Sequence, residues 1–519
     1  MTATAEDIRQ DVPILKLPAA LGGLMPLLLI ATMLVPILLV SLPPLVDVLG
    51  HIGRYSIQTG LDDHPWLRQY FSFRWQLVGN LGADILVEAL SSFTDVETSA
   101  WIVVALNQVL AATGIILLCR EIHGRITPFC LFALPLIYGL PFQFGFINFT
   151  LSMALALLAF TLWLRLGRLG RIATRAWLFV PISLGLWLCH TFGWVLLGML
   201  CTAESLVRSR VDGRTWLAAL WETGWRCLPM AAPLVPMLLW RTQEDTGGST
   251  DGWFIFGAKL GWMLSILRLD IKAVDKVSAL VLCGLIYVAL RSPRLTIDRT
   301  MGAAAALCLL AFLIMPGRIF GSFLADMRLA PYMTIIALLA IGDLKLTVSA
   351  RKWLMAAGVV FLVIRIALTT ATYAERERVL DRQLEALEAI PERARVATLV
   401  SLPCDDAWGL PWLTHVGSMA IARKHAFAND QWVVAGMNPL SVHYPKAGKF
   451  ANDSSEMVYP DACAGDRATM RGSLMQIPAD AFTHVWLVGV PPDEQPLRQD
   501  MIRIWQGPDS AVYRVAGSR

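Results

Sequence analysis

Residues 43–60 of the chain, PPLVDVLGHIGRYSIQTG, follow directly after the first hydrophobic segment. Proline is tolerated in a first helical turn and glycine suits the position past a helix end, so the stretch is predicted to form one helix. Asp47, His51, Arg54 and Gln58 are spaced four, three and four residues apart, which places them on one face, while the other face is apolar. Such a helix lies against a membrane domain, with its polar face toward water or toward a functional site.

The composition is that of an integral membrane protein. Of 519 residues, 56% are apolar and only 16% are charged, whereas a soluble globular protein is about a quarter charged. A span needs about 20 mostly apolar residues. The hydrophobic pattern predicts about eleven of them, the first being a signal anchor and not a cleavable signal peptide: 20–42, 101–119, 127–141, 148–164, 176–192, 193–207, 224–241, 274–290, 300–316, 329–344 and 353–372.

Lysine and arginine predict the orientation of these spans. If the N-terminus, with Arg9 and Lys16, is cytoplasmic, the inner segments carry roughly twice as many of these residues as the outer ones. An odd number of spans then places the first loop, 43–100, and the C-terminal part outside the cytoplasm. We therefore predict a transmembrane domain over 1–372 and an extracytoplasmic α/β domain over 373–519.

The first outer loop continues with polar features that we expect to cover part of the bundle. Asp62 and Asp63 lie in a predicted acidic turn, since adjacent carboxylates disfavour a helix. Residues 80–90 form a second amphipathic pattern, with Asp84 and Glu88 four residues apart. Thr94 and Glu97 have the spacing of a capping box before the next span.

Two arginines lie at predicted outer ends of spans, Arg318 and Arg328. Each is either an anchor to lipid headgroups or a ligand for a phosphate group. In the C-terminal domain, strands are predicted over 395–400 and 484–490, a helix over 415–424, and a closing hairpin over 501–505 and 511–515. Cys404 and Cys463 are the two cysteines of this polar part, and whether they pair stays open.

Several soluble-enzyme signatures are missing from the sequence. It has no GxxxxGK[ST], no strand-linked GxGxxG, no HExxH and no CxxC. An ATP-driven pump is therefore disfavoured, and no nucleic acid partner is expected. The polar chemistry is concentrated at the outer membrane surface.

The predicted architecture resembles the GT-C superfamily of membrane glycosyltransferases, which includes the lipid-A aminoarabinose transferase and protein mannosyltransferase types. The resemblance rests on the arrangement of spans and loops and on Pro44-Leu45-Val46-Asp47 followed by His51 and Arg54. It implies a protein of the bacterial inner membrane, serving the cell envelope. Its activity would be transfer of a sugar from a polyprenyl-phosphate donor to a lipid or glycan acceptor, among membrane lipids.

The resemblance maps the catalytic carboxylate of the first loop onto Asp47. Many family members have a tight acidic pair there, whereas this chain has Asp47 alone and the pair Asp62-Asp63 fifteen residues later. The catalytic carboxylate is thus Asp47, Asp62 or Asp63, and a divalent metal ion is possible but not required. His51 would orient Asp47 or contact the acceptor. The predicted substrate-binding residues are Arg54, Asp84, Glu88, Arg318 and Arg328.

Three other functions fit parts of the pattern. A transporter or flippase for a lipid-linked glycan would need a polar path through the bundle. A non-catalytic scaffold of an envelope glycan export system would tolerate loss of Asp47. A membrane acyltransferase would need a histidine deep in the bundle, for which His190 is the nearest candidate.

Overall fold

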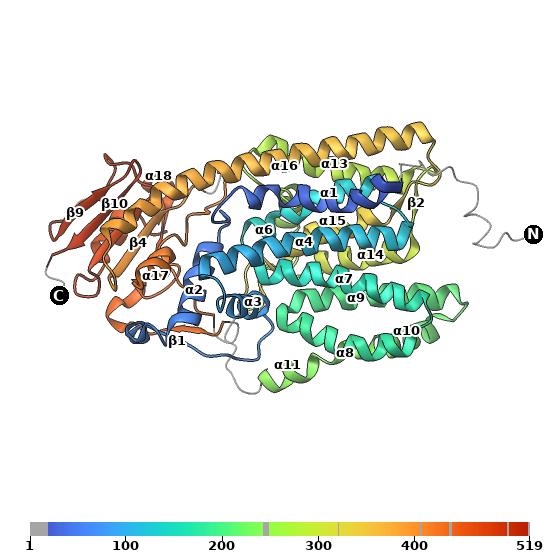
Figure 1. Cartoon of the computed structure of the whole chain (residues 1–519), viewed down its shortest axis with the longest axis horizontal. Coiled ribbons are helices and arrows are strands. Elements are labelled where there is room, and N and C mark those ends of the chain that lie inside the picture. The colour runs from blue at the N-terminus through green and yellow to red at the C-terminus, as the bar shows by residue number, and fades with distance from the viewer. Residues whose placement is uncertain are drawn as a thin grey trace, which may run out of the picture.

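The computed structural model describes residues 19–241, 249–319, 321–404, 407–434, 438–495 and 498–516. A helical bundle makes up most of the molecule, and a small domain with a mixed β-sheet lies at one end of it (Figure 1). The N-terminal Arg9 and Lys16, which contribute to the predicted orientation, lie outside the described residues.

Among the described residues, five helices are long and apolar enough to cross a membrane, so length and composition make this a multi-pass membrane protein. They are α4 (Val96–His123), α7 (Ile147–Arg168), α8 (Ile172–Cys189), α13 (Lys272–Arg291) and α16 (Val348–Leu384). Further helices of the bundle are α1 (Ala19–Leu38), α9 (Thr191–Val211), α14 (Arg299–Ile314), α15 (Ala325–Leu339) and the short α12 (Phe256–Leu264). The short strands β2 (Thr296–Ile297) and β3 (Ile341–Gly342) pair beside them. The count of eleven spans stays a prediction.

Two of the predicted spans are broken by proline, which removes a helical hydrogen bond and clashes with the preceding turn. The segment predicted over 127–141 consists of α5 (Pro128–Ala133), the 3₁₀ turn η3 (Leu134–Tyr138) and α6 (Leu140–Gln143). The segment predicted over 224–241 consists of the end of α10 (Trp216–Cys227), the 3₁₀ turn η4 (Leu228–Ala231) and α11 (Leu234–Arg241).

The first loop, residues 43–100, folds into α2 (Val48–Gly60), η2 (Pro65–Gln69), β1 (Phe71–Phe73) and α3 (Gly82–Leu90). Helix α2 begins later than predicted, and Asp47 occupies its N-cap position without a side-chain capping hydrogen bond. The predicted capping box at Thr94 is wrong, because Asp95 caps α4 by accepting a hydrogen bond from the Thr98 amide.

In the C-terminal domain the main sheet has the order β5-β4-β8-β10-β9, with β7 also paired to β4. Strand β4 is parallel to β5, β7 and β8, whereas β8, β10 and β9 are antiparallel. Two predicted strands and the closing hairpin are confirmed. The elements are η5 (Glu385–Ala389), β4 (Arg395–Ser401), α17 (Ser418–Lys424), β5 (Phe427–Ala428), β6 (Leu440–Val442), η6 (Pro445–Phe450), β7 (Met457–Val458), α18 (Asp461–Ala464), α19 (Met470–Gln476), β8 (His484–Val488), β9 (Met501–Gln506) and β10 (Ser510–Val515).

The first loop is held between the bundle and this domain. Helix α16 continues from the bundle to the sheet (Figure 1), and its Arg376 donates a hydrogen bond to the Pro44 carbonyl at 3.1 Å. Strand β1 pairs antiparallel with β6, and α2 packs against α17. A disulfide joins Cys404 to Cys463, which settles the pairing that the sequence leaves open.

Candidate active site

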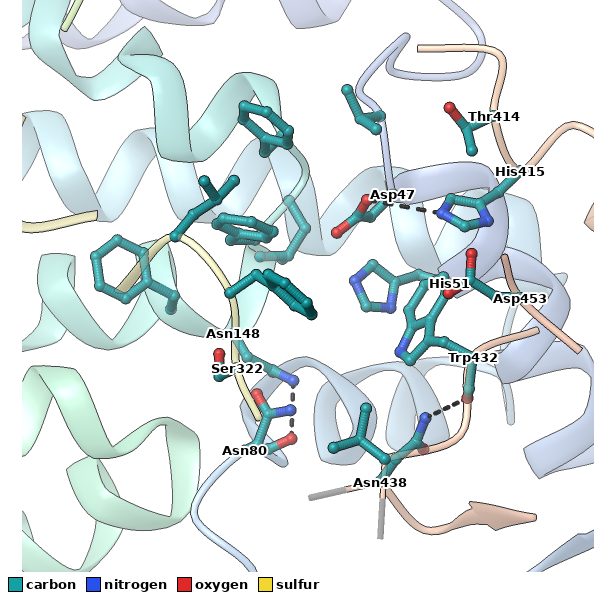
Figure 2. A pocket seen from close by; sticks show the side chains of 18 of the residues that line it. Asp47, His51, Asn80, Asn148, Ser322, Thr414, His415, Trp432, Asn438 and Asp453 are labelled. Carbon is teal, nitrogen blue, oxygen red and sulfur yellow. Dashed lines mark hydrogen bonds and ion pairs between the residues drawn. The ribbon is translucent and has the colours of Figure 1, made fainter. Parts of the chain in front are cut away.

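A cavity of about 460 Å³ lies where the first loop, the bundle and the C-terminal domain meet. Asp47 and His51 line it from the start of α2, and Arg328 lines it from α15. Figure 2 shows Asp47 and His415 facing each other, with His51 and Trp432 beside them. The remaining polar residues of the lining are Asn80, Asn148, His190, Ser322, Thr414, Asn438 and Asp453. Most of the rest is apolar, as is usual in a pocket for an organic ligand.

The backbone on both sides of Asp47 is fixed by the broken segment of the bundle. The Val46 amide donates to the Gln143 carbonyl at 3.2 Å, and the Asp47 amide donates to the Phe144 carbonyl at 3.0 Å. Gly145 makes this approach possible. Its φ is +82°, and a Cβ there would lie 2.8 Å from the Asp47 nitrogen, so a larger residue would push the two segments apart.

The Asp47 carboxylate is only 22% exposed and receives no hydrogen bond from the described residues. Burial raises the pKa of Asp47 to about 7, and the charge of Arg328 opposes this rise. A raised pKa follows because a low-dielectric site disfavours the ionised carboxylate. Asp47 is therefore suited to take up a proton near neutral pH.

Two histidines flank Trp432 at this end of the cavity. The indole ring lies 5.0 Å from the His51 ring and 4.9 Å from the His415 ring, between centroids. His415 Nε2 lies 3.9 Å from Asp47 Oδ1, and its Nδ1 lies 3.1 Å from the Asp430 carbonyl. Burial lowers the pKa of both histidines. Both are therefore neutral at pH 7.

Arg328 is the one arginine or lysine among the described residues that line the cavity. It lies in the first turn of α15, is 9% exposed, and donates to the Phe323 carbonyl at 3.1 Å. Its guanidinium carbon lies 3.9 Å from the centre of the Phe146 ring. Its Nε has no hydrogen-bond partner in the described part of the chain, so the group retains donor capacity.

The other predicted residues of α2 and α3 lie elsewhere. Arg54 Nη2 pairs with Asp84 Oδ1 at 2.9 Å, and both side chains are buried. Asn148 adds a hydrogen bond to Asp84 Oδ2 at 3.1 Å. Glu88 is on the surface and accepts a hydrogen bond from Gln58 at 2.8 Å. These contacts join α2 to α3, and Arg54, Asp84 and Glu88 do not line the cavity.

The remaining predicted residues also lie outside the lining. The Asp62 side chain is 95% exposed and pairs with Arg68, and Asp63 is exposed beside it. Arg318 pairs with Asp251 at 3.3 Å and lies over the Phe323 ring, 4.0 Å from its centre. The sequence-predicted residues that the structure brings together are thus Asp47, His51 and Arg328.

Sequence analysis missed the contribution of the C-terminal domain, namely Thr414, His415, Trp432, Asn438 and Asp453. None of them belongs to a recognisable motif, and a contact between distant segments leaves no periodic pattern. One signal was present in α2, where Gly50 and Gly53 lie three residues apart on one face. Small residues at that spacing permit close approach of another element, and here that element belongs to the C-terminal domain.

The architecture is similar to that of ArnT from Cupriavidus metallidurans, known from two crystal structures. The form bound to undecaprenyl phosphate matches with a TM-score of 0.47 and 12% identity, covering 97% of this chain and 100% of that one. The apo form matches with a TM-score of 0.48 and 13% identity, covering 96% and 100%. Both likenesses are of the overall fold. No protein-family model and no curated protein matches the chain.

Proposed function

We propose that this chain is a membrane glycosyltransferase that moves a sugar from a polyprenyl-phosphate donor to a lipid or glycan acceptor outside the cytoplasm. The observation that carries the proposal is the pairing of a half-buried carboxylate, Asp47, with a buried cation, Arg328, in one mostly apolar cavity. Transfer of a sugar in this way needs a base at the acceptor hydroxyl and a cation at the departing phosphate.

In the proposed reaction, the acceptor hydroxyl oxygen attacks the anomeric carbon of the donor sugar. Its proton passes to Asp47, a new carbon–oxygen bond forms, and the bond from the anomeric carbon to the phosphate oxygen breaks. The electron pair of that bond leaves with the polyprenyl phosphate. The energy is carried in the donor bond, which agrees with a sequence that has no nucleotide-binding loop.

Arg328 is proposed to bind the phosphate of the donor and of the leaving group. A guanidinium in a site with little water stabilises phosphate oxygens through charge-assisted hydrogen bonds. The contact with the Phe146 ring holds the guanidinium in place. Its Nε has no hydrogen-bond partner among the described residues, so not all of its donors are used. His51 and His415, both neutral, are proposed to orient Asp47 or the acceptor hydroxyl and not to supply charge.

The test is transfer of radiolabelled sugar from polyprenyl-phosphate donors in membranes that contain the wild-type chain or the Asp47→Asn variant. The substitution keeps the size of the side chain and removes the base, so transfer should fall by about 10²–10⁴-fold. Asp62→Asn is the matched control, because Asp62 is an exposed carboxylate of the same loop. Its rate should equal that of the wild type.

Other results would favour the alternatives. Loss of transfer in Asp62→Asn, with Asp47→Asn fully active, would move the base to the acidic turn. Absence of transfer by the wild-type chain across a panel of donors would contradict the proposal and favour a transporter or a scaffold. An acyltransferase would instead depend on His190, which lines the far side of the same cavity.

A further inference from the structure

We propose that His415, Asp453 and Glu456 form a binding site for one divalent metal ion of the Zn²⁺ or Mn²⁺ type, at the wall of the cavity. One ligand atom from each of these residues lies within 4.8 Å of the other two. His415 Nδ1 and Glu456 Oε1 are 3.8 Å apart, too far for a hydrogen bond. Two ligand atoms that each lie about 2.0–2.2 Å from the same ion are separated by a distance comparable to that between His415 Nδ1 and Glu456 Oε1.

Glu456 is the observation that points to a cation. Its side chain is completely buried, and among the described residues the Asp453 carboxyl beside it is the one hydrogen-bond partner of its carboxyl group. Asp453 Oδ1 has no partner in the described part of the chain. A buried carboxylate without a compensating charge is strongly unfavourable, so proteins supply a cation or a proton at such a place.

The scaffold around the three residues is already in place. The Val400 amide donates to the Glu456 carbonyl at 2.7 Å, next to the pairing of β4 with β7. The Asp453 amide donates to the Gln431 carbonyl at 3.0 Å. The His415 ring is fixed by Trp432 and by the Asp430 carbonyl. Because Nδ1 is also the nitrogen that lies near Glu456, a metal ion bound there would replace its contact with the Asp430 carbonyl.

The surroundings are rich in carboxyl groups. Asp430 is buried and accepts hydrogen bonds from the Ser418 amide at 2.6 Å and hydroxyl at 2.8 Å. Asp47 lies on the other side of His415. The one arginine or lysine of the described lining, Arg328, lies on the bundle side of the cavity. A divalent cation would balance the charge of this cluster.

The ligand set indicates the class of metal. One imidazole nitrogen with two carboxylates suits Zn²⁺ or Mn²⁺, whereas Ca²⁺ takes about six to eight oxygens. Three protein ligands leave coordination positions open. Because His415 and Asp453 line the cavity while Glu456 lies behind them, those positions would be available to a water molecule or to an anionic oxygen of a ligand in the cavity.

The site can be tested without any sugar donor, so its failure would be distinct from failure of the proposed transferase activity. The purified full chain in detergent is stripped with a chelator and titrated with Mn²⁺, and free Mn²⁺ is followed by its EPR signal. Parallel titrations with Zn²⁺ and Ca²⁺ compete for the site. We expect one Mn²⁺ per chain, displaced by Zn²⁺ and only weakly by Ca²⁺.

The variants Glu456→Gln and Asp453→Asn should weaken Mn²⁺ binding at least tenfold, while Asp480→Asn, at an exposed carboxylate of the same domain, should bind as the wild type does. Absence of saturable binding in the wild type, or equal binding by all variants, would overturn the proposal. The first outcome would indicate a proton shared by the two carboxyl groups.

A measurement on the wild type alone guards against misfolded variants. Pulsed EPR of the bound Mn²⁺ should show coupling to one imidazole nitrogen, from His415. Bound Mn²⁺ without this nitrogen coupling would place the ion at another site and would also overturn the proposal.

Discussion

The backbone of Gly50 in α2 lies directly against the indole of Trp432, and a Cβ at position 50 would fall 2.4 Å from the ring. One turn later, a Cβ on Gly53 would lie 2.7 Å from the Ser418 side chain. These two glycines let the first loop and the C-terminal domain approach closely. Because Trp432 separates His51 from His415 in the cavity wall, the shape of the candidate site depends on this contact.

Replacing Gly50 by alanine should therefore disturb the site. The added methyl group must displace Trp432, and overpacking of this kind costs about 1–3 kcal/mol. We expect a lower melting temperature and a clear loss of sugar transfer, measured on the same preparation. Gly60→Ala is the matched control, since it lies on the same helix and its nearest neighbour would be 3.4 Å from the new Cβ. If Gly50→Ala behaves like Gly60→Ala, the contact does not shape the site.

Arg328 and Arg318 are both predicted from the sequence to bind substrate, and variants of the two residues test which of them does. Arg328→Gln removes the arginine that lines the cavity, so kcat should fall by about 10²–10³-fold, as for other groups that stabilise developing negative charge. Arg318→Gln should transfer sugar nearly as fast as the wild type, because Arg318 pairs with Asp251 outside the lining. Steady-state kinetics with a lipid-phosphate donor would compare them. The reverse order would assign the phosphate to Arg318.

The sequence predicted the features that depend on residues close together in the chain. The polar face of α2, which carries Asp47 and His51 to the cavity, follows from residue spacing alone. The hairpin of β9 and β10 could be predicted because its strands are adjacent in the chain. Strands β5, β6 and β7 could not, since each has only two or three residues and is defined by partners far away in the sequence.

The candidate site was predictable to the same extent. Asp47 follows the first predicted span and Arg328 precedes another, so their positions in the sequence indicated that both could belong to the site. His415 and Asp453 reach the cavity only because α17 packs on α2, which is a long-range contact. Arg54 was predicted to bind substrate because its spacing places it beside His51. In the structure Arg54 pairs with the buried Asp84 on another helix and lies outside the cavity lining, and its substrate-binding role stays a prediction.

The Arg54–Asp84 ion pair should be a structural element of the loop. Removing one partner leaves an uncompensated buried charge, so Arg54→Met should destabilise the protein by about 3–5 kcal/mol. The double variant Arg54→Met with Asp84→Asn should recover part of this loss. Glu88→Gln, at an exposed position on α3, serves as the control and should be near neutral. Thermal unfolding in detergent would measure all four proteins.

A substrate-binding role for Arg54 would give a different result. In that case Arg54→Met would raise KM while leaving the melting temperature unchanged, and the added Asp84→Asn change would recover nothing. The stability recovered by the second substitution is thus the informative quantity, because residues in one buried pair deviate from additivity.

His484 predicts how stability changes with pH. It is buried in β8, opposite Arg514 on β10, and burial together with the Arg514 charge lowers its pKa to about 4 from 6.5. Between these two values the unfolded chain binds a proton that the folded chain does not, so stability is lost as the pH falls. The full difference corresponds to at most about 3 kcal/mol. Melting temperatures of the wild type should therefore fall between about pH 6.5 and pH 4.

The His484→Gln variant isolates this contribution from that of the other titrating groups, because it lacks the proton-binding group and keeps a hydrogen-bonding side chain. Its melting temperature should fall less steeply with decreasing pH than that of the wild type. His443→Gln, at an exposed histidine of the same domain, should retain the wild-type slope. Equal slopes for wild type and His484→Gln would show that the imidazole of His484 is protonated in the folded protein as readily as in the unfolded chain.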